Sequence, residues 1–253
     1  MKKVKIYTFS DKAPYFIPWQ FKSFKDHIQD DFEYIVMNNS SSATLDADIK
    51  NHCSSLAIQC IDVENKDFSH ACFSCSEPIQ ECIDKYISKD KEYISVIADS
   101  DLFLMRDFSF NDYMEGWDIA GLPQSRDTGG GNIIEYLWNC LIIINTTAPN
   151  ISKLKMWPGV LNHGHCDVGM ASFFYLLYND VKFKRIPTTN VIISHPEVLG
   201  LIPERVRDLY ELRFDSEIIE GSFFHFRGGS RWDSKPSEYY ESKEIFVQKL
   251  LEI

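Results

Sequence analysis

The sequence predicts an α/β fold in which a central, mixed but mostly parallel sheet has helices on both faces. Short β-rich runs alternate with segments of helical apolar spacing along the chain, a pattern typical of such folds. One run, residues 93–98, is almost continuously apolar, as expected for a strand that is covered on both faces. With 253 residues, 44% of them hydrophobic, the chain is long enough to bury a sizeable core.

The first half of the chain contains four predicted strands and three predicted helices. The strands are expected at residues 4–9, 32–37, 58–63 and 93–98, and the helices at residues 19–28, 45–56 and 77–88. In the last helix the apolar residues have helical spacing, and Pro78 is expected in the first turn, where its missing N–H costs nothing.

The second half of the chain continues the alternation. Strands are expected at residues 117–122, 141–144, 181–186 and 222–226, and helices at residues 168–178 and 236–251. A polar, glycine-rich loop is expected at residues 124–132, either as a flap over a ligand or as a plain connection. It is not a phosphate-binding P-loop, because the Gly-Lys-Ser/Thr that must follow is missing.

Composition excludes several classes of function. The net charge of −11 argues against a nucleic-acid or charged-membrane partner, although a bound cation could still attract a small anion. No apolar run is long enough to span a bilayer, and no secretory leader is recognisable. Seven scattered cysteines do not indicate a disulfide framework, so a reducing, cytoplasmic setting is expected.

The most informative segment is the triplet Asp99-Ser100-Asp101, which directly follows the apolar strand. Burying carboxylates within such a strand is costly, so both acids are expected at its carboxyl end, where open α/β sheets bind ligands. Residues i and i+2 of an extended chain point the same way, and two such carboxylates are best stabilised by Mg²⁺ or Mn²⁺. The alternative is that the two acids only cap a turn.

A second signal lies near the other end of the chain, at residues 223–232. His225 stands in an aromatic run, where a histidine is usually a core residue. Here two glycines and two arginines, Arg227 and Arg231, follow it at once, an arrangement that brings backbone and guanidinium groups close to an anion. His225 is therefore a candidate nitrogen ligand for the same ion.

Together these segments resemble the GT-A-fold glycosyltransferases, most closely the glycogenin and bacterial galactosyltransferase group, family 8. The stretch from His225 to Trp232 is similar to the group's His-x-x-Gly-x-x-Lys-Pro-Trp motif, and residues 138–145 are similar to its Asn-(Ser/Ala)-Gly strand. His165-Cys166-Asp167 stands where the group has Asp-Gln-Asp. The chain departs from the group at Arg231 for lysine, Leu141 for glycine and His165-Cys166 for Asp-Gln.

The resemblance implies a Rossmann-like GT-A domain over residues 1–253, with a nucleotide-binding half at 1–101 and an acceptor and metal-closing half at 102–253. It implies transfer of a sugar from a nucleotide diphosphate, a UDP-sugar, to a hydroxyl of a glycan or other acceptor, with Mn²⁺ or Mg²⁺ and with retention of configuration. The implied metal ligands are Asp99, Asp101 and His225. The implied donor-binding residues are Tyr7, Thr8, Asp11, Lys85, Asp99, Ser100 and Arg231.

Asn139 and Asp167 are the implied catalytic residues, and His165 and Trp232 the implied acceptor residues. If the enzyme inverts, Asp167 is the candidate general base; as a helix N-cap it also has a structural explanation. Lys85 has a comparable alternative as part of a solvated helix face.

Other interpretations remain open at this stage. A metal-dependent nucleotidyltransferase or hydrolase also uses paired aspartates, and a catalytically inactive sugar-binding domain would keep the same residues. A glycosidase is disfavoured, because its two carboxyls must flank the scissile bond. Cys72-x-x-Cys75 matches no paired zinc knuckle, so both cysteines are interpreted as ordinary small hydrophobes. His163-Gly164-His165 is interpreted as loop or acceptor surface.

Overall fold

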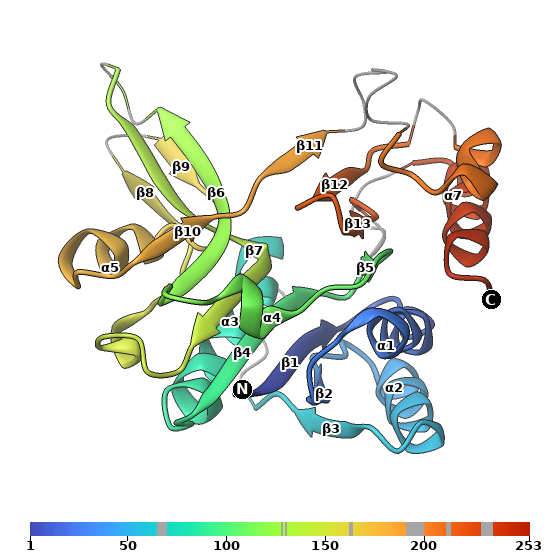
Figure 1. The fold of residues 1–253 in the computed structure, drawn as a ribbon, viewed down its shortest axis with the longest axis horizontal. Coiled ribbons are helices and arrows are strands. Elements are labelled where there is room, and N and C mark those ends of the chain that lie inside the picture. The colour runs from blue at the N-terminus through green and yellow to red at the C-terminus, as the bar shows by residue number, and fades with distance from the viewer. Residues whose placement is uncertain are drawn as a thin grey trace.

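The computed structural model describes residues 1–64, 70–127, 129, 131–161, 164–190, 200–210, 214–228 and 235–253. A seven-stranded sheet forms its centre (Figure 1). In spatial order its strands are β10 (Phe183–Arg185), β6 (Ile119–Asp127), β7 (Ile133–Asn145), β4 (Tyr93–Asp99), β1 (Lys3–Ser10), β2 (Phe32–Asn38) and β3 (Gln59–Asp62). Only β7 runs antiparallel to its neighbours; the other pairings are parallel. The prediction of a mixed, mostly parallel sheet is confirmed.

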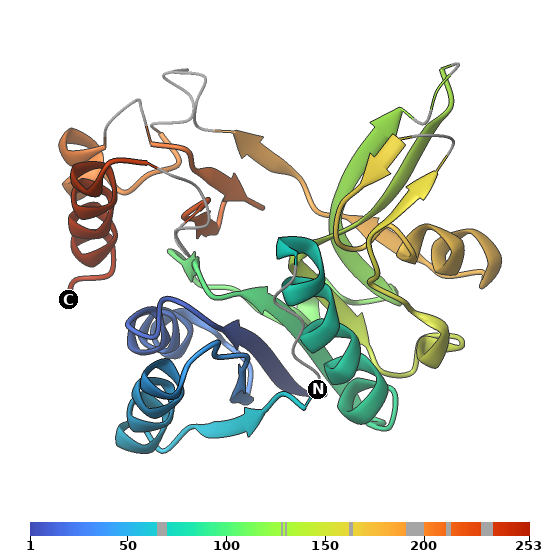
Figure 2. The same ribbon diagram turned by 180° about the vertical axis from the view of Figure 1, so that it is seen from behind.

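Helices cover both faces of this sheet because side chains alternate along each strand. Val4 and Ile6 of β1 belong to the apolar cluster that includes α1 (Phe16–His27) and α2 (Ala43–Ser55). Tyr7 belongs to the opposite cluster, with α3 (Ala71–Cys82), the π-helical turn η1 (Ile83–Ile87) and α5 (Ser172–Tyr178). Figure 2 shows α3 from behind, lying along the sheet on the side away from α1 and α2.

A second, four-stranded sheet follows directly from the first. Its order is β11 (Thr188–Asn190), β12 (Glu217–Ile219), β13 (Phe223–His225) and β5 (Leu102–Leu104). The chain leaves the large sheet at the end of β4 and enters the small one at β5, with only Ser100 and Asp101 between them. An aromatic cluster that includes Phe103, Phe224 and Phe226 packs this sheet against α7 (Ser237–Leu250) and the start of α1.

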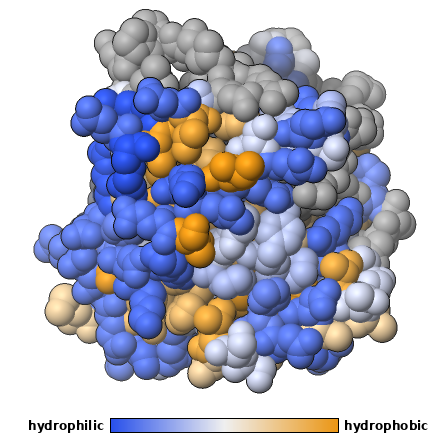
Figure 3. Space-filling model, turned by 90° about the vertical axis from the view of Figure 1, so that its right-hand side faces the viewer, coloured by the Kyte–Doolittle hydropathy of each residue, from blue (hydrophilic) through white to orange (hydrophobic). Residues whose placement is uncertain are grey.

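Shorter elements complete the described chain. They are α4 (Phe110–Tyr113), the hairpin of β8 (Gly159–Leu161) and β9 (Gly164–Cys166), and the 3-10 turns η2 (Ile151–Lys153) and η3 (Glu204–Leu209). The side of the molecule on the right of Figure 1 is mostly hydrophilic, with apolar residues in small groups (Figure 3). Among the described residues, no helix is long and apolar enough to cross a membrane.

The expected position of Pro78 is wrong, since it lies inside α3 rather than in its first turn. The helix begins earlier because His70 caps it, with Nδ1 accepting from the backbone N–H of Cys72 at 3.2 Å. Proline cannot donate to the carbonyl four residues before it, which is that of Ser74. Asn39 fills this gap, donating from Nδ2 to the Ser74 oxygen at 2.8 Å.

Several further boundaries differ from the prediction; β7, for example, begins at Ile133 and not at residue 141. The glycine-rich loop is shorter than residues 124–132, because β6 continues to Asp127 and pairs with the start of β7 as a hairpin. The helix expected at residues 168–178 begins only at Ser172, after a turn in which the Met170 N–H donates to the Asp167 carbonyl. At the end of β6 and at the start of α5, backbone hydrogen bonds decide where the element begins or ends. The local pattern of apolar residues carries no signal for these hydrogen bonds.

Candidate metal centre

Three possible metal ligands meet at the carboxyl edge of the large sheet. Asp99 is the last residue of β4, and Asp101 directly precedes β5. Strand β13 pairs with β5 so that His225 lies opposite Leu102, and the Phe226 N–H donates to the Asp101 carbonyl at 2.8 Å. As a result, one ligand atom from each of Asp99, Asp101 and His225 lies within 4.8 Å of the others. The sequence prediction named the same three residues.

The two carboxylates of the triplet are held close together in a partly dehydrated setting. Burial raises the pKa of Asp99, and the neighbouring charge of Asp101 raises it further, to about 7. His225 opposes this rise, as does the backbone N–H of Ser100, which donates to Asp99 Oδ1 at 3.0 Å. Like charges placed together in this way are compensated best by a cation.

The imidazole of His225 is buried, with 3% of the residue exposed, and carboxylates face both of its ring nitrogens. Nε2 lies 3.3 Å from Asp101 Oδ1, and Nδ1 lies 3.2 Å from Glu217 Oε2. Burial alone would lower the pKa of His225, but Cys140, Asp101 and Glu217 outweigh it and raise that pKa well above its usual value. The ring is therefore clamped, with Nε2 directed to the triplet.

Glu217 is the functional candidate that sequence reasoning missed. It begins β12, is 7% exposed, and lies directly opposite His225 in the strand pairing. Its second oxygen, Oε1, lies 3.5 Å from Arg227 Nη1, which also approaches Asp215 Oδ1 at 3.4 Å. Histidines that bind metals usually direct their second nitrogen to such a carboxylate, which fixes the tautomer and the ring orientation. Arg227 is thus engaged with these two acids.

The donor set fits a hard divalent cation. Carboxylate oxygens suit Mg²⁺ and Mn²⁺, and an added imidazole favours Mn²⁺ over Mg²⁺. The fit rests on the short mutual distances of the three side chains. It agrees with the pKa of Asp99, which burial raises most and the neighbouring Asp101 raises further. Asp99, Asp101 and His225 would hold such an ion.

Asp167 and Asn139 both contact the N-terminal part of α3. Asp167 Oδ1 accepts from the backbone N–H of Val168 at 2.7 Å and from the Cys72 thiol at 3.3 Å. Asn139 Nδ2 donates to Cys75 Sγ at 3.7 Å. Burial raises the pKa of Cys75, and the charges of Asp99, Asp167 and Asp101 add to the rise.

The explanation of Asp167 as a helix N-cap is wrong. Helix α5 begins at Ser172, and its N-cap is Ala171. Asp167 instead caps its own turn through the Val168 N–H, and its backbone N–H donates to the Tyr136 hydroxyl at 3.2 Å. Asp167 is therefore held by several contacts, and none of them caps helix α5.

Two of the expected donor-binding side chains lie inside the fold. Tyr7 is 1% exposed and stacks on Tyr86 with ring centroids 6.4 Å apart. Thr8 is equally buried, and its Oγ1 has no hydrogen-bond partner among the described residues. The polar side chains at this edge are instead Ser10 and, beyond the end of β1, Asp11. Ser10 Oγ is buried and has no hydrogen-bond partner among the described residues.

Lys85 lies far from the metal ligands along α3 and η1. Its Nζ pairs with Glu64 Oε2 at 2.6 Å and with Glu81 Oε1 at 3.2 Å. At a rise of about 1.5 Å per residue it lies about 15 Å along the helix from Cys75, toward the opposite edge of the sheet. This placement favours the alternative in which Lys85 belongs to a solvated, ion-paired helix face.

Some expected residues cannot be placed. Arg231 and Trp232 lie outside the described residues, and so do Thr128 and Gly130 of the glycine-rich loop. The backbone of His165 belongs to β9, but its side chain is outside the described set, as is the whole of His163. Their roles stay predictions.

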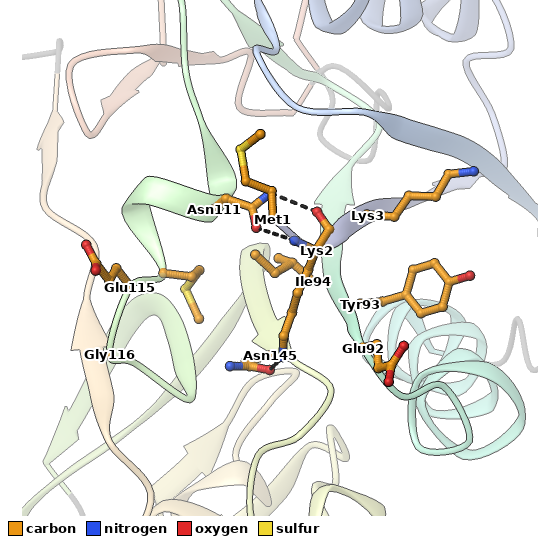
Figure 4. A pocket seen from close by; sticks show the side chains of 11 residues that line it. Met1, Lys2, Lys3, Glu92, Tyr93, Ile94, Asn111, Glu115, Gly116 and Asn145 are labelled. Carbon is orange, nitrogen blue, oxygen red and sulfur yellow. Dashed lines mark hydrogen bonds between the residues drawn. The ribbon is translucent and has the colours of Figure 1, made fainter.

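A cavity lies at the opposite, amino edge of the sheet. This cavity, of about 670 Å³, is lined by the start of β1 and β4, the end of β7, and α4 (Figure 4). Its polar groups bond to one another: Asn111 exchanges two 2.8 Å hydrogen bonds with the Lys2 backbone, and Lys2 Nζ donates to Asn145 Oδ1 at 2.5 Å. We therefore place the candidate site at the carboxyl edge.

No family model matches the chain, and no curated protein matches it. Solved structures similar to it include the following three. WbbM, described as a bifunctional glycosyltransferase in its apo form, has a TM-score of 0.45 and 11% identity, over 74% of this chain and 39% of WbbM. An active-site mutant of LgtC has a TM-score of 0.43 and 11% identity, over 72% of each chain.

The third structure, the glycosyltransferase GlyE of Streptococcus pneumoniae TIGR4, has a TM-score of 0.46 and 14% identity, over 100% of this chain and 63% of GlyE. The match covers only 39% of WbbM, so the chain spans well under half the length of that protein. These likenesses are distant, and the case for an activity rests on the residues of the site.

Proposed function

We propose that this chain is a metal-dependent glycosyltransferase that moves a sugar from a nucleotide diphosphate, most simply a UDP-sugar, to a hydroxyl of a glycan or other acceptor. The observation that carries the proposal is the meeting of Asp99 and Asp101 with His225, which is far away in sequence, within 4.8 Å at the carboxyl edge of the sheet. A turn cap would account for the two aspartates, but it would not require a buried histidine clamped beside them.

In such a reaction the bond between the anomeric carbon and the diphosphate oxygen breaks, and negative charge grows on the diphosphate. A bound divalent cation would stabilise that charge. Asp101 and His225 would hold it, with Asp99 as the third ligand, and Glu217 keeps the imidazole directed to it through the 3.2 Å contact with Nδ1. By the family resemblance, Arg231 would bind a phosphate oxygen.

On the sugar side, we assign Asp167 and Asn139 as the residues that contact the transferred sugar. Among the described residues only Oδ1 of Asp167 is engaged, which leaves Oδ2 for a substrate hydroxyl. In a retaining reaction this carboxylate would hydrogen-bond donor or acceptor hydroxyls. In an inverting reaction it would take the proton of the acceptor hydroxyl. We propose retention, and NMR of the anomeric proton in the product distinguishes the two.

The proposal is tested with a panel of nucleotide sugars and Mn²⁺. We expect at least one nucleotide diphosphate to raise the melting temperature of the wild-type protein with Mn²⁺ present and not with EDTA. Glycan acceptors incubated with that donor should gain one sugar by mass spectrometry, which a hydrolase or nucleotidyltransferase would not produce. If no nucleotide diphosphate stabilises the protein in the presence of metal, the proposed function is wrong.

A further inference from the structure

The Cys72-x-x-Cys75 pair, which sequence reasoning interprets as two ordinary small hydrophobes, contacts both residues that we assign to the sugar. The cysteines lie in the first two turns of α3, and residues spaced i, i+3 share one helix face. The Cys72 thiol lies 3.3 Å from Asp167 Oδ1, and Cys75 Sγ lies 3.7 Å from Asn139 Nδ2. Two side chains on one helix face thus contact two residues from separate parts of the chain.

Both sulfurs are thiols at neutral pH. Burial raises the pKa of Cys72 to about 11, with Asp167 adding to the rise. Burial together with Asp99, Asp167 and Asp101 raises the pKa of Cys75 above its usual range. Cys72 can therefore donate its S–H to the carboxylate, while Cys75 presents an uncharged sulfur to the amide N–H of Asn139.

The segment of α3 that carries the two thiols is held by contacts on both sides. His70 caps its start, and the Asn39 side chain at the end of β2 takes the Ser74 carbonyl that Pro78 leaves without its helical donor. Asn39 is itself tied to the end of β1, because its backbone N–H donates to the Ser10 carbonyl at 2.9 Å. The thiols are thus held relative to the same sheet edge that carries Asp99.

We propose that Cys72 and Cys75 are positioning residues for the transferred sugar. They engage Asp167 Oδ1 and Asn139 Nδ2, which leaves Asp167 Oδ2 and Asn139 Oδ1 directed to sugar hydroxyls. This inference rests on the proposed function, because it concerns the sugar side of the same site. It assigns the pair no contact with the metal. Its effect should therefore appear in binding of the sugar and not in binding of the diphosphate.

The experiment compares Cys72→Ala, Cys72→Ser and Cys75→Ala with the wild type, and Cys60→Ala serves as a control on β3, away from the site. Calorimetric titrations with Mn²⁺ present use UDP, UDP-glucose and UDP-galactose. Losing one hydrogen bond that orients a charged group corresponds to a drop of about tenfold in affinity. We expect that loss for the better-bound UDP-sugar in Cys72→Ala and Cys75→Ala, while UDP affinity stays within about twofold.

Cys72→Ser should keep the affinity for the UDP-sugar, because a hydroxyl also donates to Asp167 Oδ1. Equal losses for UDP and UDP-sugar, no loss in either alanine variant, or a serine variant as impaired as alanine would each overturn the inference. If Cys72→Ala does not fold, a double-mutant cycle of Cys75→Ala and Asn139→Ala decides, since positioning predicts losses that do not add. If wild-type protein with Mn²⁺ binds neither UDP nor a UDP-sugar, the proposed function itself fails.

Discussion

The two edges of the large sheet show opposite ways of arranging polar groups. At the amino edge the cavity of about 670 Å³ is lined by groups that satisfy one another, as the Lys2, Asn111 and Asn145 contacts in Figure 4 show. At the carboxyl edge the carboxylates of Asp99 and Asp101 lie close together, and burial together with the charge of Asp101 raises the pKa of Asp99 to about 7.

This difference teaches that the chemistry of the polar groups, and not the size of a cavity, distinguishes the edge where we propose the site. The Lys2, Asn111 and Asn145 groups that line the amino-edge cavity are engaged with one another, and so are less available to a ligand. Carboxylates held together cost stability unless something compensates them, and such arrangements are concentrated at functional sites. The amino edge is thus a matched control for the carboxyl edge, within one sheet and under the same solution conditions.

The largest expected effect is that of Asp101→Asn. Replacing a metal ligand carboxylate by an amide removes one of the negative charges that hold the cation, so Mn²⁺ affinity should fall by about 100-fold or more. Turnover should be lost with it. Calorimetric titration with Mn²⁺ measures the affinity, and Asn145→Ala at the amino edge should bind as the wild type does. Equal Mn²⁺ binding by wild type and Asp101→Asn would remove the metal centre from this edge.

Glu217→Ala should have the next largest effect. It leaves all three ligands in place but frees the imidazole of His225, and loss of such a supporting carboxylate typically costs about 10- to 100-fold in metal affinity. Glu217→Gln should lose less, because its amide oxygen can still accept from Nδ1. Calorimetric titration with Mn²⁺ checks this: the affinity should be highest for the wild type, lower for Glu217→Gln and lowest for Glu217→Ala. Identical affinities in all three would mean that Glu217 only fills space.

Asn111→Ala tests the amino edge in return. It removes both hydrogen bonds to the Lys2 backbone and one to Asp30, so the free energy of unfolding in urea should fall by about 1–3 kcal/mol. Mn²⁺ affinity should not change. A loss of metal or nucleotide binding in this variant would show that the two edges are not independent.

The smallest effect is expected from Asn39→Ala, which leaves the Ser74 carbonyl without its side-chain donor. The cost should be about 1 kcal/mol in the free energy of unfolding, since water can replace part of a single hydrogen bond. A double variant that also carries Pro78→Ala restores a helical donor to the Ser74 carbonyl and should recover part of that loss. Urea unfolding of the four proteins in this cycle measures both terms.

Much of the fold, and the three side chains that meet at the carboxyl edge, could be predicted from the sequence, because their signals are local or chemically unusual. The apolar run before Asp99 identifies β4, and the acids directly after it can only be at its end. His225 stands out because glycines and arginines follow it. Strands as short as β5, β12 and β13, of three residues each, have no period to detect.

The remaining site residues depend on contacts between distant segments. Glu217 reaches His225 through the register of β12 against β13, and Cys72 reaches Asp167 across the interface of α3 with a turn 95 positions away. Neither pairing leaves a trace in local composition. Pro78 misled for the same reason: the helix continues past it because Asn39, on another element, supplies the missing donor.

The pairing of β5 with β13 has a consequence for how this chain could change over evolutionary time or in the laboratory. Because the Phe226 N–H bonds to the Asp101 carbonyl, the distance between aspartate and histidine ligands is set by adjacent rungs of one ladder. The long stretch of chain between those rungs does not set it. Insertions, deletions or whole replaced loops between β5 and β12 could therefore alter what the protein recognises while the ion-holding geometry is inherited intact.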